Sequence, residues 1–312
     1  MALNRRETIL KINSLPTIDE VGLSERVKVL SSRSVKSETK EKFINLAISC
    51  IDLTTLEGTD TQFKIQELFQ KALNPLPGVT DVPSVAAICI FPTFIADLKK
   101  SKLYSPKVKI ATVAGAFPHG KSNLSIKLKE VEMAIDSGAD EIDIVIDRGE
   151  FLSGNFSKVY DDIMYVKELT ADRQIPLKVI LETGELGGFD NINKAATLAL
   201  CAGADFIKTS TGKINISATP ESSYILFNSV KQFYQETNLM RGIKPSGGIK
   251  TTKQALAILS ILSETLGTEW MNPAYFRFGA SSLLDDLLLQ KLKAINGHYQ
   301  SKNYIPISSS TY

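Results

Sequence analysis

The run Ala204-Asp205-Phe206-Ile207-Lys208-Thr209-Ser210-Thr211-Gly212-Lys213 is a short apolar segment that ends in a lysine and continues into a glycine-bearing loop. Gly242-Ile243-Lys244-Pro245-Ser246-Gly247-Gly248 repeats this arrangement further along the chain. Both are typical of a barrel strand followed by a loop that carries chemistry. Neighbouring parallel strands lie about 4.8 Å apart, so we expect the two lysines to lie close together.

Short apolar runs alternate with amphipathic helical segments across residues 46–296, which is the pattern of a βα protein. Most helical segments follow a Ser, Thr, Asp or Asn that can serve as the N-cap. The length and the number of repeats predict an α/β fold of the (β/α)₈ TIM barrel type, although a doubly wound sheet can also reach eight strands. The candidate strands are residues 46–53, 85–90, 109–113, 141–146, 177–181, 205–208, 242–244 and 276–279.

The segments outside the repeats are short. Residues 1–45 are polar with helical patches, which predicts an N-terminal helical extension over the bottom of the barrel. Residues 46–296 form the predicted barrel, and residues 297–312 have the composition of a flexible C-terminal tail. No second domain or linker is indicated.

Composition excludes several classes of function. Acids and bases are intermixed, with a net charge of +2, so neither a nucleic-acid nor a membrane partner is predicted. The two histidines, His119 and His298, are too few for the usual zinc sites, and no metal is expected. Cys50, Cys89 and Cys201 lie in apolar stretches, which is typical of reduced thiols in a cytoplasmic protein. No export signal or membrane-spanning run is expected.

Two lysines at neighbouring strand ends suggest covalent amine chemistry. Each ammonium group disfavours the charge of the other, so Lys208 or Lys244 could be neutral near pH 7. A neutral amine can form a Schiff base with a carbonyl substrate. The alternative is that both lysines simply extend to solvent.

Carboxylates are also expected inside the barrel. Alternation along Glu141-Ile142-Asp143-Ile144-Val145-Ile146 places Glu141 and Asp143 on one face, among apolar neighbours. Such a carboxylate is costly to bury without a cation, and Lys208 and Lys244 are the obvious cations. A buried ion pair that serves only packing is the alternative.

Glycine clusters follow the last two predicted strands, at Gly247-Gly248 and at Gly279-Ala280-Ser281-Ser282. Phosphate sites in barrels frequently lie in these two loops. Glycine lets the backbone approach an anion, and the final helix would direct its N-terminus towards it. Together the clusters predict a phosphate-binding site, whereas either one alone is equally typical of a turn or a helix cap.

A competing motif lies at Gly115-Ala116-Phe117-Pro118-His119-Gly120-Lys121-Ser122, which matches the P-loop pattern G-x-x-x-x-G-K-[ST] after a plausible strand. A P-loop-type NTPase is therefore an alternative function. Pro118 argues against it, because proline removes an N–H from the loop that would hold the phosphates.

Several motifs, in the same order along residues 46–296, resemble the 2-deoxyribose-5-phosphate aldolase family of class I aldolases. The resemblance implies a (β/α)₈ barrel that reversibly cleaves 2-deoxy-D-ribose 5-phosphate to acetaldehyde and D-glyceraldehyde 3-phosphate, as in deoxyribonucleoside and carbohydrate catabolism. It implies no metal or organic cofactor. The motifs are Ile51-Asp52-Leu53-Thr54-Thr55-Leu56, Ala87-Ile88-Cys89-Ile90-Phe91-Pro92, Phe117-Pro118-His119-Gly120, Lys178-Val179-Ile180-Leu181-Glu182-Thr183-Gly184-Glu185-Leu186 and the segments at 204–213, 242–249 and 276–284.

The resemblance also implies roles for single residues. Lys208 would form the Schiff base, Lys244 would keep it deprotonated, and Asp143 would handle proton transfer with Lys244. Some members of the family end in a tyrosine that assists proton exchange, which makes Tyr312 a candidate shuttle. Asp52 would line the site, and Cys89 would either line it or, as the favoured alternative, pack in the core. Substrate- and phosphate-contacting positions fall on Thr211, Gly212, Lys213, Gly247, Gly248, Lys250, Gly279, Ser281 and Ser282.

Two positions depart from the family pattern. The usual A-G-G-[IV]-R after the second lysine reads Ser246-Gly247-Gly248-Ile249-Lys250, so a serine replaces an alanine and a lysine replaces an arginine that could face phosphate.

A non-catalytic barrel scaffold related to the aldolase is a further alternative, because a fold does not guarantee activity. The predicted partner is a small phosphorylated sugar, and a homodimer is the candidate assembly.

Overall fold

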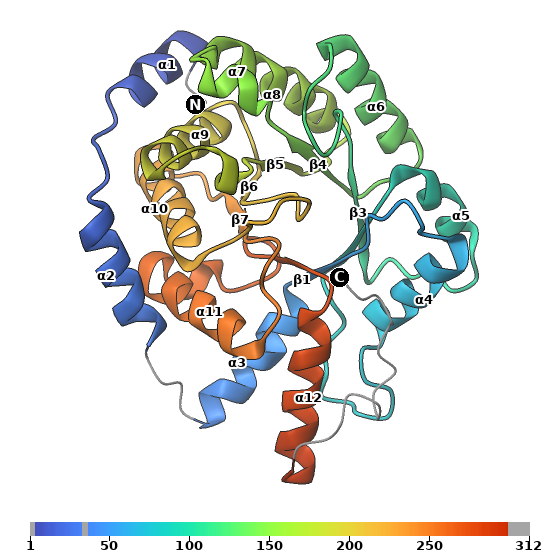
Figure 1. Ribbon diagram of the computed structural model, residues 1–312. Helices are drawn as coiled ribbons and strands as arrows, with labels where there is room; N and C mark the ends of the chain where they lie inside the picture. The colour runs from blue at the N-terminus through green and yellow to red at the C-terminus, as the bar shows by residue number, and fades with distance from the viewer. Residues whose placement is uncertain (1–3, 33–36, 299–312) are drawn as a thin grey trace.

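The computed structural model describes residues 4–32 and 37–298. Within them, eight parallel strands form one sheet in the order β7-β6-β5-β4-β3-β2-β1-β8. Bridges Ile243 to Phe276 and Ser246 to Gly279 join the two ends of this sheet, so it closes into a barrel surrounded by helices (Figure 1). The predicted (β/α)₈ barrel is confirmed.

Six of the eight strands are shorter than the apolar runs that predicted them. The prediction is correct for β3 (Lys109–Val113) and β7 (Gly242–Lys244). The other strands differ from it by one to five residues at an end. They are β1 (Ile51–Thr54), β2 (Ala87–Ile90), β4 (Glu141–Val145), β5 (Leu177–Ile180), β6 (Phe206–Lys208) and β8 (Phe278–Ala280).

The largest boundary difference is at the first strand, which was predicted to begin at residue 46. Residues 46–49 instead belong to helix α3 (Ser37–Ser49), and the boundary proposed between residues 45 and 46 falls inside this helix. Ile44, Ala47 and Ile48 are buried at helical spacing directly before the β-branched run, so the apolar residues of the two elements merge into one pattern.

Residues 1–45 were predicted to cover the barrel bottom, but the first two helices of this segment lie along the outer side of the helical ring. Helix α1 (Arg5–Asn13) packs on α8 and α9, and α2 (Glu20–Ser31) packs on α10 and α11, outside the helical ring (Figure 1). Their buried faces are narrow, with Ile12 on α1 and Val27 and Leu30 on α2. They therefore add a partial outer layer to the helical ring.

The remaining helices follow the strands along the chain and bury apolar residues in the core. Several begin at a side-chain cap, as Thr251 does at the start of α11, where its hydroxyl accepts from the N–H of Gln254. They are α4 (Gln62–Leu73), α5 (Ile95–Lys100), α6 (Leu124–Asp136), α7 (Arg148–Leu152), α8 (Phe156–Ala171), α9 (Phe189–Cys201), α10 (Pro220–Thr237), α11 (Thr252–Leu266) and α12 (Leu283–Asn296).

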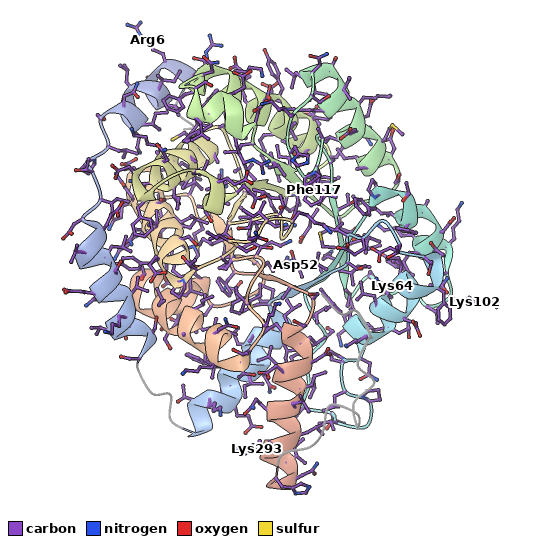
Figure 2. All side chains as sticks on the ribbon, in the orientation of Figure 1. Arg6, Asp52, Lys64, Lys102, Phe117 and Lys293 are labelled. Carbon is purple, nitrogen blue, oxygen red and sulfur yellow. The ribbon has the colours of Figure 1, made fainter. Side chains whose placement is uncertain are left out.

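The interior of the barrel has an apolar half and a charged half. Ala87 and Cys89 on β2 pack with Ala111 and Val113 on β3 in a small cluster of their own. Strands β1, β4, β5, β6 and β7 direct charged side chains inwards, and Figure 2 shows Asp52 of β1 near the centre of the molecule. The charged half therefore contains the candidate chemistry.

The tail prediction, including Tyr312, lies outside the described residues. Among the helices of the described part, none is both long and apolar enough to cross a membrane.

Candidate active site

Three lysines meet one buried aspartate in the barrel. Asp143 on β4 accepts from Lys208 at 2.9 Å and from Lys244 at 2.9 Å, both through its Oδ2. Its other oxygen, Oδ1, accepts from Lys178 of β5 at 2.7 Å. The structure thus brings together the three residues predicted from sequence and adds a third lysine to them.

Strand register produces this arrangement. Asp143 is paired with Lys178 between β4 and β5, and Lys208 is paired with Lys244 between β6 and β7. Because side chains alternate along a strand, residues paired across neighbouring strands point to the same face. All four therefore point into the barrel from adjacent positions.

A second set of ion pairs lies beside the contacts of Asp143. Asp52 on β1 pairs with Lys244 at 2.5 Å and with Arg277 at 2.6 Å. Arg277 also contacts Glu141 at 2.7 Å, and Glu141 in turn lies 2.7 Å from Lys178. Lys208 and Lys244 were predicted to be the cations that pair with Glu141. This prediction was wrong, because Glu141 pairs with Lys178 and Arg277.

We call the seven charged side chains of these ion pairs the inner ion cluster. Its cationic groups outnumber its carboxylates. Its members are all buried. If one amine is neutral, the numbers of positive and negative groups match, which matters because an unpaired buried charge is costly. The cluster consists of Asp52, Glu141, Asp143, Lys178, Lys208, Lys244 and Arg277.

Lys208 is the amine that is most easily neutral. Burial lowers its pKa below the ordinary value, and the charge of Lys244 lowers it further, against the opposing effect of Asp143. Lys244 has a raised pKa, because the charges of Asp143 and Asp52 outweigh its burial. The same balance raises the pKa of Lys178. A neutral amine at Lys208 beside a charged Lys244 matches the arrangement expected from sequence.

Asp143 remains ionised in this setting. Burial alone would raise its pKa, but Lys178, Lys244 and Lys208 outweigh burial and hold the pKa of Asp143 well below its ordinary value. It can therefore accept a proton from a neighbouring ammonium group only transiently. Such a carboxylate suits proton exchange between a substrate and Lys244.

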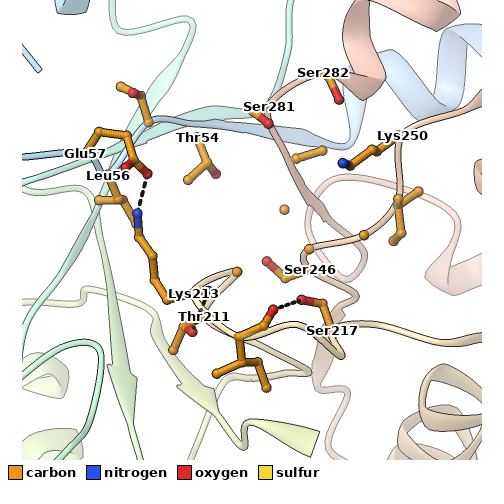
Figure 3. Close-up of a pocket in the computed structure, with 18 of the residues that line it drawn as sticks. Thr54, Leu56, Glu57, Thr211, Lys213, Ser217, Ser246, Lys250, Ser281 and Ser282 are labelled. Carbon is orange, nitrogen blue, oxygen red and sulfur yellow. Dashed lines mark hydrogen bonds and ion pairs between the residues drawn. The ribbon is translucent and has the colours of Figure 1, made fainter. Parts of the chain in front are cut away.

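A cavity of about 580 Å³ opens at the carboxyl ends of the strands, above this cluster (Figure 3). Lys208 is only 1% exposed and is not part of its wall, so its amine lies one layer below. The loops after β1, β6, β7 and β8 form the wall. It contains every predicted binding position, namely Thr211, Gly212, Lys213, Gly247, Gly248, Lys250, Gly279, Ser281 and Ser282.

The loop after β7 has a backbone that requires glycine. Gly247 and Gly248 both have φ of 75°, in the left-handed region. The N–H of Gly247 donates to the carbonyl of Gly279 at 3.1 Å, which ties the two glycine loops together. Ser282 precedes α12 without capping it through its side chain, so its hydroxyl is not used at the helix start. The positive end of α12 faces this part of the cavity.

Lysines on the cavity wall have different surroundings. Lys213 forms an ion pair with Glu57 from the loop after β1. Lys250 is exposed, and its amine points towards the serines at the start of α12 (Figure 3). The two lysines lie on opposite sides of the cavity in this view (Figure 3).

The segment that matches a P-loop, residues 115–122, lies between β3 and α6. Its Gly120 packs on the end of β4, where a Cβ would lie 2.6 Å from the carbonyl oxygens of Val145 and Ile146. The glycine is thus required for packing, and Lys121 extends to solvent with a 70% exposed side chain. The closed barrel also differs from the open sheet of P-loop proteins, so this alternative was wrong.

Sequence reasoning missed several charged residues at the site. Lys178 belongs to the quoted motif, and its period-two spacing with Ile180 would have placed it inside the barrel. Arg277 directly precedes β8 and gave no such signal. Glu182, just after β5, and Arg148, at the start of α7, form an ion pair at 3.2 Å beside Thr211, and the sequence does not reveal this approach.

The fold and site define a class of enzyme, the barrel aldolases that use a lysine amine as nucleophile. The model of the DeoC/LacD family of aldolases matches residues 46–287, and the chain belongs to this family.

Relatives of known name agree with this assignment. The chain is 38% identical to deoxyribose-phosphate aldolase from Mus musculus over 90% of its own length and 91% of the relative. It is 37% identical to the enzyme of the same name from Homo sapiens over the same shares. A solved deoxyribose phosphate aldolase from Aeropyrum pernix, at 23% identity, covers 82% of this chain and 99% of its own, with a TM-score of 0.62, which shows the shared fold.

Proposed function

We propose that the chain reversibly cleaves 2-deoxy-D-ribose 5-phosphate to acetaldehyde and D-glyceraldehyde 3-phosphate through a Schiff base on Lys208. The observation that carries this proposal is a buried amine with a lowered pKa, held between Lys244 and Asp143 beneath a cavity with two glycine loops. The family and its named relatives support the same substrate.

In the proposed reaction, the neutral amine of Lys208 attacks the aldehyde carbon of the open-chain sugar and forms a carbinolamine. Loss of water gives an iminium ion, which withdraws electrons from the neighbouring carbon. The hydroxyl on carbon 3 loses its proton, the bond between carbons 2 and 3 breaks, and its electron pair forms an enamine. D-Glyceraldehyde 3-phosphate leaves. Protonation of the enamine and addition of water then release acetaldehyde.

The neighbours of Lys208 support the proton transfers. Oδ2 of Asp143 lies within hydrogen-bond distance of the amines of both Lys208 and Lys244. A proton can therefore pass between Lys244, Asp143 and the carbinolamine oxygen that forms at Lys208. Lys244 stays charged and disfavours protonation of Lys208. The ionised Asp143 accepts the proton that the amine releases. These roles are proposals for Lys208, Lys244 and Asp143.

Phosphate is proposed to bind between the glycine loops and the start of α12. Gly248, Ser281 and Ser282 offer N–H and hydroxyl donors, and Lys250 offers a charge at the cavity mouth. Thr211, Gly212 and Lys213 would contact the sugar from the opposite wall. A homodimer and a cytoplasmic location remain predictions from the sequence.

Borohydride trapping tests the proposed function. The protein is treated with sodium borohydride in the presence of acetaldehyde, and the modified lysine is located by peptide mass spectrometry. We expect a single reduced adduct on Lys208, and none in Lys208→Met. Lys253→Met, at an exposed lysine of α11, is the matched control and should be trapped normally. An adduct on another lysine, or no adduct, would contradict the mechanism.

A further inference from the structure

Glu182 contacts Thr211 through both oxygens of its carboxylate. Its Oε1 accepts from the backbone N–H of Thr211 at 3.1 Å, and its Oε2 accepts from the Thr211 hydroxyl at 2.5 Å. Glu182 is fully buried, whereas Thr211 lines the cavity. A carboxylate below the wall therefore fixes both the backbone and the side chain of one wall residue.

The backbone around Glu182 is bent to make this contact. Leu181 donates to the carbonyl of Lys208 and Thr183 donates to that of Thr209, both at 2.9 Å, so the pairing of the two strands continues on either side of Glu182. Glu182 itself has φ of 57° and ψ of 58°. The left-handed conformation is unfavourable for a residue with a Cβ, so the surrounding contacts must hold it there.

Arg148 supports the carboxylate from the other side. Its Nη1 donates to Oε2 of Glu182 at 3.2 Å, and its Nε lies 3.0 Å from Glu185. A guanidinium and a backbone N–H can only donate, so both oxygens of Glu182 serve as acceptors. Burial raises the pKa of Glu182, but its ionised form, which the charge of Arg148 favours, has no hydrogen to donate, so in that form the hydrogen bond runs from the Thr211 hydroxyl to the carboxylate.

The hydroxyl of Thr211 has little freedom left. Its hydrogen is donated to Glu182, and its oxygen accepts from the backbone N–H of Lys213 at 3.0 Å. A hydroxyl has one donor and two acceptor positions, so a single lone pair remains. A ligand group that hydrogen-bonds to this oxygen must donate. An alcohol can do this, but a carbonyl oxygen or a phosphate dianion cannot.

The position of Thr211 indicates which alcohol this is. Thr211 follows Lys208 by three residues, and it lies across the cavity from Lys250 and Ser282 (Figure 3). If carbon 1 of the sugar is joined to Lys208 and its phosphate lies at Ser282, the middle carbons of the sugar would lie beside Thr211. The hydroxyl on carbon 3 must lose its proton in cleavage. The hydroxyl on carbon 4 keeps its proton and is free to donate throughout.

We propose that Glu182, supported by Arg148, is a positioning residue that presents the Thr211 hydroxyl as an acceptor for the carbon 4 hydroxyl of the substrate. This inference rests on the proposed function. It makes Glu182 a determinant of specificity, because the site would bind a sugar phosphate with this hydroxyl more tightly than one without it. Glu182 does not touch the substrate and acts only through Thr211.

The test compares two substrates that differ in one hydroxyl. Acetaldehyde release is measured from 2-deoxyribose 5-phosphate and from its 4-deoxy analogue, in the parent protein and in Glu182→Gln. A neutral amide cannot accept from all three donors. We expect the preference for the hydroxylated substrate, as a ratio of kcat/KM values, to fall about tenfold in Glu182→Gln. The value for the 4-deoxy analogue should stay within about twofold of the parent value.

Glu185→Gln is the matched control. The change removes the other carboxylate that contacts Arg148. Glu185 is partly exposed and makes none of the hydrogen bonds that hold Thr211. We expect this variant to keep the substrate preference of the parent. Thr211→Val, which removes only the hydroxyl at similar size, should lose the preference as Glu182→Gln does. If Glu182→Gln does not fold, an unchanged preference in Thr211→Val would itself overturn the proposal.

Two outcomes for Glu182→Gln would overturn the inference. One is an equal loss with both substrates, which would indicate a general disturbance of the loop. The other is an unchanged ratio. Borohydride trapping with acetaldehyde separates this inference from the proposed function, because acetaldehyde has no carbon 4 hydroxyl. Normal trapping on Lys208 with an unchanged ratio contradicts only the role of Glu182, whereas absent trapping in the parent protein contradicts the aldolase mechanism.

Discussion

Lys208 lies directly opposite Lys244 in the pairing of β6 with β7, and both amines donate to the same oxygen of Asp143. One shared carboxylate oxygen cannot fully compensate two ammonium groups. Lys244 has a second carboxylate partner in Asp52, whereas Lys208 has only Asp143 among the ion pairs of the described residues. This asymmetry explains why the pKa is lowered at Lys208 and raised at Lys244.

Lys244→Met should move the activity to higher pH. Burial still lowers the pKa of Lys208 in this variant, but the repulsion from Lys244 is gone, and Oδ2 of Asp143 then accepts from Lys208 alone. The pKa of Lys208 therefore rises, and less of the amine is neutral at pH 7. We expect the rising limb of the kcat/KM profile to move up by about one pH unit or more. The rate of borohydride trapping with acetaldehyde, measured across pH, should follow the same shift, and a profile that coincides with the parent would contradict this role.

Asp143→Asn should destabilise the fold as well as reduce activity. Lys178, Lys208 and Lys244 would lose the carboxylate that they share in a fully buried site. Removing one partner from a buried ionic network typically costs about 3–5 kcal/mol. The free energy of unfolding in urea at pH 7 is the measurement, with Asp136→Asn on the exposed surface of α6 as control. A loss no larger than that of the control would contradict the shared role of Asp143.

Acid should weaken the fold through the same cluster. The pKa values of Asp52, Glu141 and Asp143 are held below their ordinary values, because the neighbouring cations outweigh burial. Their contribution to stability is thus present above an ordinary carboxyl pKa of about 4 and is lost as the pH falls towards the lower pKa values of the folded state. We expect the free energy of unfolding to fall steeply below about pH 4 and to change little between about pH 5 and 7. A flat dependence between about pH 5 and 2 would contradict the cluster's ionic state.

The sequence contained enough to predict the barrel and the central lysine pair. The apolar runs that end in Lys208 and Lys244, with Asp143 on an inward face, predicted the correct strands because alternation and strand ends are local properties. The last residues of α3, 46–49, were assigned to the first strand because their buried side chains adjoin those of β1 without a turn signal. The path of α1 and α2 along the outer ring depends on contacts far apart in sequence, and no local pattern encodes it.

The partners of the central residues were harder to predict. Arg277 reaches Glu141 across the barrel, over 136 positions in sequence, and only the closed sheet brings the two together. Glu182 meets Thr211 because its own backbone is left-handed, a conformation that sequence seldom predicts for glutamate. Spacing can predict which residues end the strands, but the pairing inside the barrel follows from its closure and register.

The terminal Tyr312 gives a prediction that depends on the family resemblance. Tyr312→Phe keeps the ring and removes the phenol that would exchange protons with the enamine carbon. We expect slower incorporation of solvent deuterium into acetaldehyde, roughly tenfold or more, with an unchanged free energy of unfolding. Trapping on Lys208 should be unaffected, since iminium formation does not need this proton. Equal exchange in Tyr312→Phe and the parent would remove Tyr312 from the mechanism.

Lys250 gives a prediction about phosphate. Its amine points towards Ser281 and Ser282 at the cavity mouth, whereas the neighbouring Lys253 lies on α11 outside the cavity wall (Figure 3). Lys250→Met should raise KM for 2-deoxyribose 5-phosphate by about tenfold or less, because an exposed ion pair contributes about 1 kcal/mol.

The same Lys250→Met change should leave cleavage of unphosphorylated 2-deoxyribose unaltered, because that substrate carries no charge for the amine to attract. Lys250→Arg should bind the phosphorylated sugar at least as well as the parent, since a guanidinium can contact two phosphate oxygens at once. Lys253→Met serves as the matched loss of one positive charge and should affect neither substrate. Added salt should narrow the difference between the parent and Lys250→Met, because it screens an exposed charge. If Lys250→Met impaired both substrates equally, the lysine would support the loop structure and would have no specific part in phosphate binding.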